Sequence, residues 1–574
     1  MMYRSRNVCV PRAGALAVVL CLAALFSTLA VATPVQAQSW PVTWQEEHDF
    51  QNGPTPFEPL MAFWYDLERK SPDVSIRPLT VTLLDRPVTL VTVSRDPILD
   101  PRDAIRSGKT IVLIVNSVHG SETAGKEASQ LVARDLVAGD LQHLLDDVIV
   151  LFMPIANPDG GEVLRRTNED GFDLNRDYLK LESQEVHALV TQVMNEWTPD
   201  IHIDTHHGGA MPYTLTWQGT LNPAADAELR AYPYQHIFPR MREALRAEDY
   251  DGFDYSGART IDGVPGWGST SIEPRKHHVY AGLVNSIAIL FETPRGSFRL
   301  RDQGTVLEEV PEYERYYHQV RGQLLGKRAV LEVAAEQREQ IRTLTTGARL
   351  KAVANGASYS EDDRVVLDYR LISRGDEEVW VRDDDAPLGY RAETRPIFLA
   401  YEPVRTTARP LGYVLPPSMA RTLPVLLDHG IVVHRFTEPV ELELEVYQAT
   451  EVRHDYYFQG HYLKAVDVEK STETVAVPAG SYYVSTAQSR GNLIAYLMEP
   501  ETDDNLITWG YANHLLRVTP PAADDGGDAA SMARQRARRP QRVPMMRLVN
   551  PQPLPLLEVV PFNETDRTRH YQVW

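Results

Sequence analysis

The sequence predicts an α/β fold, with a mixed, largely parallel sheet flanked by helices, followed by a second, β-rich region. An unbroken apolar run at 111–115 is typical of a strand that is covered on both faces. A helical pattern follows at 123–138, and Gly139 is placed to end it. A second apolar run at 148–155 completes a strand–helix–strand unit, and such units build parallel sheets.

The other predicted elements continue this pattern along the chain. Helices are expected within 45–75, at 183–197 and in the long segments of 310–343, and strands at 79–84, 88–93, 200–206 and 286–293. Beyond about residue 347 the sequence changes to short alternating runs separated by Asp, Gly and Pro, which favour strands. A chain of 574 residues exceeds one ordinary domain, so we expect domains at 38–346 and 347–574.

The first 37 residues are predicted to be a secretory signal peptide. Arg4, Arg6 and Arg12 precede an apolar stretch at 13–32, and a small-residue cleavage site ends at Ala37. A membrane anchor is the alternative, because the stretch is nearly long enough to span a bilayer. The cleavage site favours the signal peptide, so we expect a secreted or periplasmic protein that is not membrane-bound after cleavage.

Composition narrows the chemistry that the exported chain can use. Both cysteines, Cys9 and Cys21, lie in the predicted signal peptide, so a metal would be held by histidine and carboxylate ligands. The formal net charge of −20 opposes nucleic acid or an anionic membrane as a partner. An acidic and then arginine-rich piece at 521–542 predicts a solvated, flexible loop.

Candidate metal ligands stand where predicted strands end. His119 and Glu122 follow the apolar run at the strand-to-helix corner, where open α/β sheets place their ligands. Three histidines of the later strand compete for the third position: alternation puts His202 and His206 on one face and His207 on the other. His206 is favoured because it lies at the carboxyl end, level with the first two ligands.

Further candidates would complete a zinc hydrolase. Two histidines and a glutamate with an open fourth position are typical of catalytic zinc, and Glu292, at the end of the last apolar strand, could be the general base. Asp173 could orient His119, and Arg165 could stabilise an oxyanion. Asn175 and Arg176 offer donors for a free carboxylate.

These motifs resemble the zinc metallocarboxypeptidases of the carboxypeptidase A family over roughly residues 45–340. The matching segments occur in the family's order: H-G-S-E (119–122), N-P-D-G (157–160), L-R-R-T (164–167), G-F-D-L-N-R (171–176), D-T-H-H-G (204–208) and L-F-E-T-P (290–294). The resemblance implies one zinc ion on His119, Glu122 and His206, with Glu292 as base. It implies the roles above for Arg165, Asp173, Asn175 and Arg176. The family's mobile tyrosine has no aligned counterpart; Tyr280 is near it in sequence.

The predicted function is therefore removal of C-terminal residues from peptides that have a free terminal carboxylate. Within enzymes, the alternative is a zinc amidase or deacylase that acts on cell-wall peptides or N-acyl amino acids. From another class, the alternative is a non-catalytic peptide-binding module on the same fold. The second region resembles extensions found on some bacterial members of the family, and no activity is assigned to it.

Overall fold

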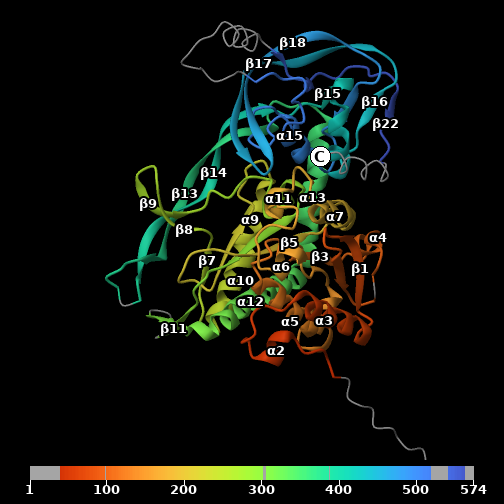
Figure 1. The fold of residues 1–574 in the computed structure, drawn as a ribbon. Helices are drawn as coiled ribbons and strands as arrows, with labels where there is room; N and C mark the ends of the chain where they lie inside the picture. Colours follow the sequence, from red (N-terminus) through yellow and green to blue (C-terminus); the bar gives the residue numbers. More distant parts are fainter. Residues whose placement is uncertain (1–38, 97, 302–305, 387, 519–540, 563–574) are drawn as a thin grey trace, which may run out of the picture. The chain divides into compact units, whose positions relative to one another are not determined.

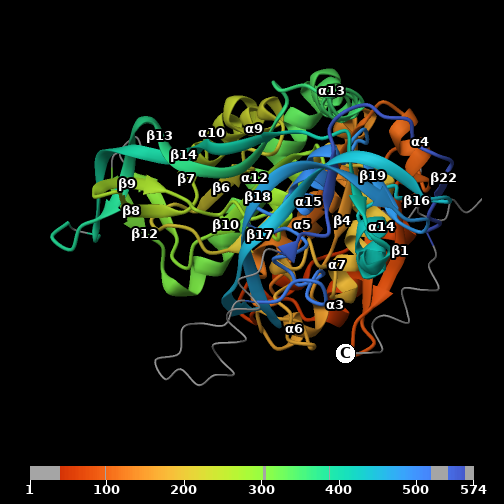
Figure 2. The ribbon, with the colours of Figure 1, turned by 90° about the horizontal axis from the view of Figure 1, so that it is seen from above.

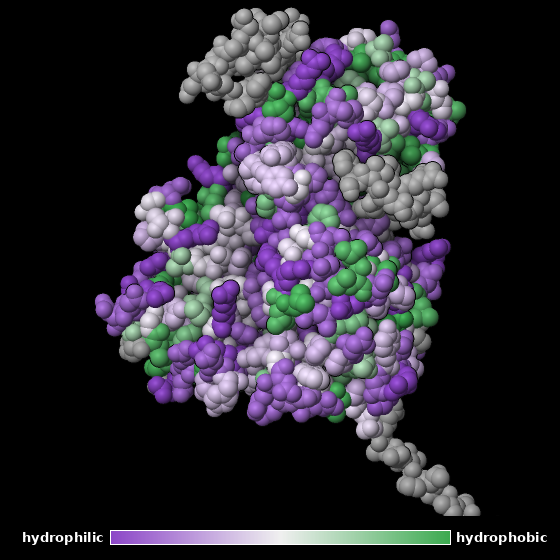
Figure 3. Space-filling model, viewed as in Figure 1, coloured by the Kyte–Doolittle hydropathy of each residue, from purple (hydrophilic) through white to green (hydrophobic). Residues whose placement is uncertain are grey.

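The computed structural model describes residues 39–96, 98–301, 306–386, 388–518 and 541–562. The predicted signal peptide, 1–37, and residues 521–540 of the predicted loop lie outside the described residues. Within the described ranges, none of the helices combines the length and apolarity needed to cross a membrane. Hydrophilic residues cover most of the face shown in Figure 3, with hydrophobic residues in small scattered groups.

An eight-stranded mixed sheet organises the first half of the chain (Figure 1), in the order β1-β2-β4-β3-β5-β10-β6-β7. Its strands are β1 (Val74–Val81), β2 (Pro87–Val93), β3 (Thr110–Val115), β4 (Val148–Met153), β5 (Ile201–His207), β6 (Leu215–Gly219), β7 (Gly252–Asp254) and β10 (Ile287–Thr293). The four central strands, β4, β3, β5 and β10, are parallel to their neighbours in this group. The predicted mixed, largely parallel sheet is confirmed.

Local sequence explains these central strands. Every residue of β3 and β4 is buried, which is what an unbroken run of branched apolar residues requires. Because β3, β5 and β10 are adjacent and parallel, their carboxyl ends meet at one edge of the sheet. The histidines and carboxylates that follow these strands are therefore brought together by the topology.

Helices cover the sheet on both faces. They are α2 (Trp44–His48), α3 (Phe57–Lys70), α4 (Pro101–Arg106), α5 (Ala124–Ala138), α6 (Pro158–Glu162), η2 (Leu174–Arg176), α7 (Gln184–Leu189), η3 (Val190–Met194), α8 (Asn195–Trp197), α9 (Ala227–Tyr232), η4 (Pro233–Ile237), α10 (Phe238–Arg246), α11 (His277–Leu283), α12 (Arg315–Glu336) and α13 (Arg338–Ala357). The predicted helix at 123–138 is α5, and the predicted long helices near 310–343 are α12 and α13, the second of which continues to Ala357.

The rest of the chain is rich in strands, as predicted. A four-stranded sheet joins β13 (Arg364–Arg382) and β14 (Tyr390–Ala408) to β9 (Val264–Gly268) and β8 (Gly257–Ile261). Figure 2 shows these strands together beside β7. A larger sheet contains β15 (Gly412–Leu415), β16 (His434–Phe436), β17 (Val440–Phe458), β18 (His461–Val477), β19 (Tyr482–Ser485), β20 (Gln541–Arg542), β21 (Met546–Leu548) and β22 (Leu557–Val559). Short helices η6 (Pro417–Thr422), α14 (Leu423–Asp428) and α15 (Gly491–Met498) accompany it.

One cluster of buried apolar residues extends across the predicted boundary at 346. It joins Leu189 and Tyr280 to Tyr413 and Leu497, which belong to the β-rich region. Burial of apolar surface of this kind is the main stabilising term in folding. The two regions therefore share a core, and each depends on the other for burial.

Candidate metal centre

Three side chains converge at the edge of the sheet where β3, β5 and β10 end. His119 and Glu122 lie in the loop between β3 and α5, and His206 lies near the end of β5. All three are buried, and one ligand atom from each lies within 4.8 Å of the other two. Among the described residues this is the group of three or more His, Cys, Asp or Glu side chains that could hold a metal ion.

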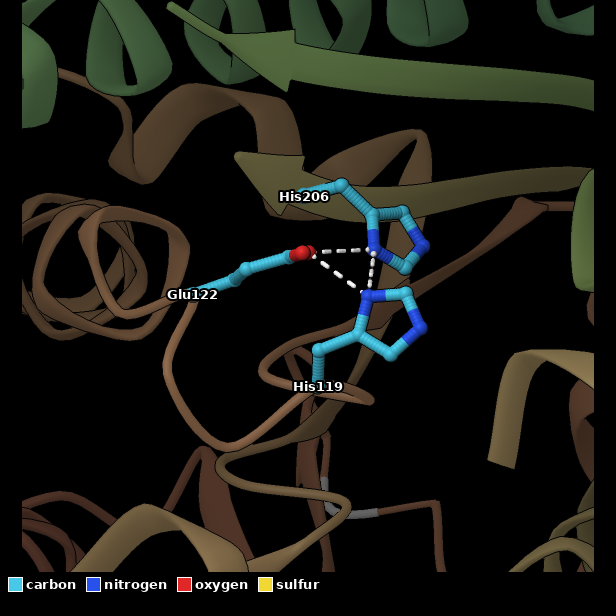
Figure 4. Close-up of side chains that lie close together, drawn as sticks. All are labelled: His119, Glu122 and His206. Atoms are coloured by element: carbon cyan, nitrogen blue, oxygen red, sulfur yellow. Dashed lines mark hydrogen bonds and ion pairs between the residues drawn. The ribbon is translucent and has the colours of Figure 1, made fainter. Parts of the chain in front are cut away.

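The two rings and the carboxylate point at a common centre (Figure 4). Nδ1 of His206 lies 2.7 Å from Oε2 of Glu122, and Nδ1 of His119 lies 2.9 Å from the same oxygen. The two Nδ1 atoms are 3.1 Å apart. Two imidazole nitrogens and one carboxylate oxygen form the donor set of a zinc site with an open position.

The far nitrogen of each ring meets a carboxylate. His119 donates from Nε2 to Oδ1 of Asp173 at 3.0 Å, and Nε2 of His206 lies 2.9 Å from Oδ1 of Asp204. A carboxylate accepts only from an N–H, so this arrangement places the proton on Nε2 and leaves the Nδ1 lone pair directed inward. The residues present therefore fit a divalent cation.

Without a cation, the charges of the cluster favour an additional proton on His206. Burial raises the pKa of Glu122, but hydrogen bonds from His119 and His206 outweigh it and hold that pKa well below its ordinary value. Burial opposes protonation of His206, but Asp204 and Glu122 outweigh it and raise its pKa. Without a cation, a proton on His206 balances the two buried carboxylates. A bound cation would supply that positive charge.

Glu292 lies beside this cluster. It is paired in parallel register with His206 across β10 and β5, so both side chains lie on the same face of the sheet. The pKa of Glu292 is raised to about 8, chiefly by burial and also by the charges of Glu122 and Asp204, against the lowering effect of His206. A carboxyl group poised near neutral pH can both accept and donate a proton.

Comparison with known proteins identifies the region that carries this cluster. Residues 60–256 match the family described as Zinc carboxypeptidase. These residues therefore carry a zinc carboxypeptidase domain. The matched residues include His119, Glu122 and His206 and end before Glu292. The protein is thus a hydrolase of the metallocarboxypeptidase class.

The match extends to curated relatives over most of their length. "Carboxypeptidase 2" of Trichophyton rubrum is 24% identical over 423 residues, which cover 70% of this chain and 74% of the relative. "Carboxypeptidase 2" of Trichophyton tonsurans is 23% identical over 423 residues, with the same coverage. A solved metallo-carboxypeptidase from Burkholderia cenocepacia is 21% identical and covers 49% of this chain and 69% of its own, with a TM-score of 0.37.

Gly208 leaves space for the Glu292 carboxylate. A Cβ atom at Gly208 would lie 2.4 Å from Oε2 of Glu292, which is closer than real Cβ atoms approach. The obstructing atom is the end of a flexible side chain, so the carboxylate would move and the backbone would remain. We therefore expect Gly208→Ala to lower kcat by roughly 10²-fold through loss of general-base geometry, with little change in thermal stability.

Steady-state kinetics and thermal unfolding of Gly208→Ala check this expectation. Gly347→Ala is a matched control, because a Cβ at that helical glycine meets nothing within 4 Å. Unchanged kcat in Gly208→Ala would show that the Glu292 carboxylate tolerates displacement. A large fall in the unfolding temperature would show that the glycine serves the fold.

The structure gives two adjacent arginines different partners. Arg165, predicted to stabilise an oxyanion, pairs with Glu169 at 2.5 Å through its guanidinium. Arg166 instead reaches the cluster: its Nε donates to Asp173 at 2.9 Å, and Nη1 lies 3.4 Å from Oε1 of Glu122. Consecutive residues of a loop point in different directions, so the doublet alone does not say which one faces the site.

The structure places the predicted carboxylate-binding pair beside the cluster. Asn175 is buried, its Oδ1 accepts from the backbone N–H of His277 at 2.8 Å, and its Nδ2 lies 2.9 Å from Nε2 of His206. The amide group of Asn175 therefore contacts the ring of a candidate ligand. Arg176 is partly exposed and donates from Nη1 to the carbonyl of Asn175.

Two residues of the site, Asp204 and Tyr255, were not predicted from the sequence. Asp204 lies two residues before His206 in the same strand, so alternation puts both on one face, and this spacing was the available signal for their contact. Tyr255 lies near charged residues from several elements, among them Glu292, Arg176 and Glu122. Burial raises the pKa of its hydroxyl, and these charges have smaller effects on that pKa. By contrast, the Tyr280 hydroxyl is buried 2.8 Å from Nδ1 of His429. No local pattern marks Tyr255.

Proposed function

We propose that this protein is a zinc-dependent carboxypeptidase that hydrolyses the C-terminal peptide bond of peptides, with Glu292 as general base. The observation that carries the proposal is the convergence of His119, Glu122 and His206 beside Glu292 at adjacent strand ends. His207 lies outside this group, because its Nε2 accepts from the backbone N–H of Ala124 at 2.8 Å.

The chain would hold one Zn²⁺ through Nδ1 of both histidines and the carboxylate of Glu122. Bound zinc supplies a water molecule whose pKa is lowered to about 7 and a positive charge that polarises the scissile carbonyl. Glu292 would take a proton from that water and pass it to the leaving amine. Asp173 and Asp204 would orient the two imidazoles.

Substrate recognition is proposed to depend on the terminal carboxylate. Arg176 offers a planar fork of N–H donors, one of which donates to the backbone carbonyl of Asn175. Tyr255 adds a hydroxyl in the same neighbourhood. A substrate that ends in a carboxylate would therefore be fixed with its last peptide bond near Glu292, and a chain that continues would lack this contact.

Blocked dipeptides test the proposal. Mature protein should hydrolyse N-blocked dipeptides that have a free carboxylate, and a chelator should abolish turnover that zinc then restores. Dipeptides amidated at the C-terminus should be poor substrates. Hydrolysis confined to cell-wall peptides or N-acyl amino acids would favour the amidase or deacylase alternative, and binding without turnover would favour the non-catalytic module.

The two neighbouring arginines make a matched pair of variants. We expect Arg166→Ala to lower kcat/KM by roughly 10²-fold, because it removes the guanidinium beside Glu122 where negative charge develops on the substrate. Arg165→Ala should change kcat/KM less than about threefold, because it removes a surface ion pair. Steady-state kinetics of both variants, together with their measured zinc content, test this expected ranking. The opposite ranking would restore Arg165 as the oxyanion residue.

We also propose that residues 1–37 direct export, with cleavage after Ala37, and that residues 38–346 carry catalysis. Mass spectrometry of the protein purified from its host would locate the mature N-terminus. Detection of a chain that starts at Met1 would contradict cleavage.

A further inference from the structure

The hairpin formed by β17 and β18 reaches from the β-rich region to the candidate metal centre. Its strands are joined by Gln459 and Gly460, which have φ of 49° and 81°. Two successive residues with positive φ form the tight turn that suits a twisted hairpin, and glycine adopts this conformation without strain. The tip of the hairpin, defined here as residues 456–462, is therefore a well-defined projection.

The hairpin tip rests on the loop that supports the metal centre. Oε1 of Gln459 accepts from the backbone N–H of Asp173 at 3.2 Å, and Asp173 holds His119. Nε2 of His461 lies 2.8 Å from Oε1 of Glu182 on the far side of the same loop. The loop that carries Asp173 and Glu182 also carries Arg176. The hairpin tip therefore lies at the part of the site that is proposed to hold the terminal carboxylate of the substrate.

A second segment of the site packs against one face of the tip. The guanidinium of Arg275 lies 5.1 Å from the ring centre of Phe458 and 5.7 Å from that of Trp509. Burial opposes the charge of Arg275, but Asp504, Glu273 and Tyr456 outweigh it and raise its pKa. Two residues further on, the backbone of His277 binds Asn175. The hairpin tip thus touches both segments that frame the proposed carboxylate site.

The two faces of the tip differ. Tyr456 and Phe458 lie on the face that packs on Arg275, with ring centres 5.8 Å apart. Tyr457 and Tyr462 form a cross-strand pair with ring centres 5.0 Å apart, and successive residues of a strand point to opposite faces. Tyr456 is 47% exposed although its own face packs on the site, so part of its ring is free to contact a ligand.

The guanidinium of Arg275, which interacts with Tyr456, is buried and lies with its Nε 3.2 Å from Oδ2 of Asp504. The exposed part of the Tyr456 ring is therefore the surface of this wall that we consider for contact with a substrate, and it is aromatic. Aromatic rings favour contact with apolar and aromatic side chains.

We propose that the hairpin tip is a wall of the substrate site, where Tyr456 contacts the side chain of the C-terminal residue and favours large apolar and aromatic residues. The proposal rests on the proposed function, because it takes the carboxylate end of the peptide to lie at Arg176. It assigns to the β-rich region a direct part in specificity.

The test compares Tyr456→Ala with Tyr462→Ala, a matched control on the opposite face of the same tip. Substrates are N-blocked dipeptides that end in Phe or in Ala. Tyr456→Ala should lower kcat/KM for the Phe substrate about 10-fold and for the Ala substrate less than twofold. Tyr462→Ala should change both less than twofold. Thermal unfolding shows whether each variant keeps its fold.

An equal loss on both substrates, or no loss on either, would overturn the proposal. The same preference can be measured without turnover, as the Kd of each dipeptide for zinc-loaded Glu292→Gln protein with and without Tyr456→Ala. A wild-type protein that binds Phe-ended dipeptides through Tyr456 and hydrolyses none would disprove the proposed function and leave this inference standing.

Discussion

Glu292→Gln should lower kcat by roughly 10²–10⁴-fold, the range that a positioned general base supplies. Glutamine keeps the size of the side chain and removes its ability to accept a proton. The carboxylate is buried in register with His206, and burial raises its pKa to about 8, so its chemistry is suited to proton transfer near neutral pH. Steady-state kinetics on a blocked dipeptide measures the effect.

Measurement of the zinc content distinguishes a loss of the general base in Glu292→Gln from damage to the metal centre. Glu292 is outside the group of three ligand atoms, so Glu292→Gln should bind zinc with an affinity close to that of the wild type. Turnover that survives the substitution would disprove the role of Glu292. A variant that has lost both zinc and activity would leave that role undecided between base and ligand, and Glu292→Asp would then resolve it by retaining the carboxylate.

His206→Ala should remove zinc binding and reduce activity to the level of chelator-treated protein. Residues that merely orient a metal ligand are worth about 10–100-fold in metal affinity, so loss of a ligand should cost more than about 100-fold. The ring also balances the charge of Asp204 and Glu122, both buried. Leaving two buried carboxylates without a cation is costly, so we also expect lower thermal stability.

The adjacent histidine is the control for this second prediction. His207→Ala should keep zinc, because Nε2 of His207 accepts from the backbone of Ala124 and does not face the cluster. Titration of chelator-stripped protein with zinc in the presence of a competing chelator measures both affinities. Equal loss of zinc in the two variants would contradict the assignment of His206 alone.

Much of the fold was predictable because its signals are local. The buried runs of β3, β4 and β10 and the helical spacing of α5 are each contained in fewer than twenty residues. The candidate ligands were predictable for the same reason, since each follows a strand whose direction the sequence indicates. Asp173 was placed near His119 by the resemblance, and the structure brings the two within 3.0 Å.

Other features depend on contacts between distant segments. The contact of Gln459 with Asp173 joins residues that are 286 positions apart, and no sequence pattern within either segment predicts it. The surroundings of Tyr255 combine charges from several loops. Arg165 was predicted to stabilise an oxyanion, but the structure pairs it with Glu169 and places Arg166 against Asp173, because the direction of a loop side chain is set by its neighbours in space.

By itself, the sequence determined the parallel core and the types and order of the candidate metal ligands, because hydrophobic periodicity and strand ends are properties of short segments. Only the tertiary structure decided that Arg166 faces Glu122, that Asp204 holds His206 and that a hairpin of the β-rich region borders the site. Such contacts follow from how packed elements are oriented relative to one another, and that orientation is a property of the whole chain.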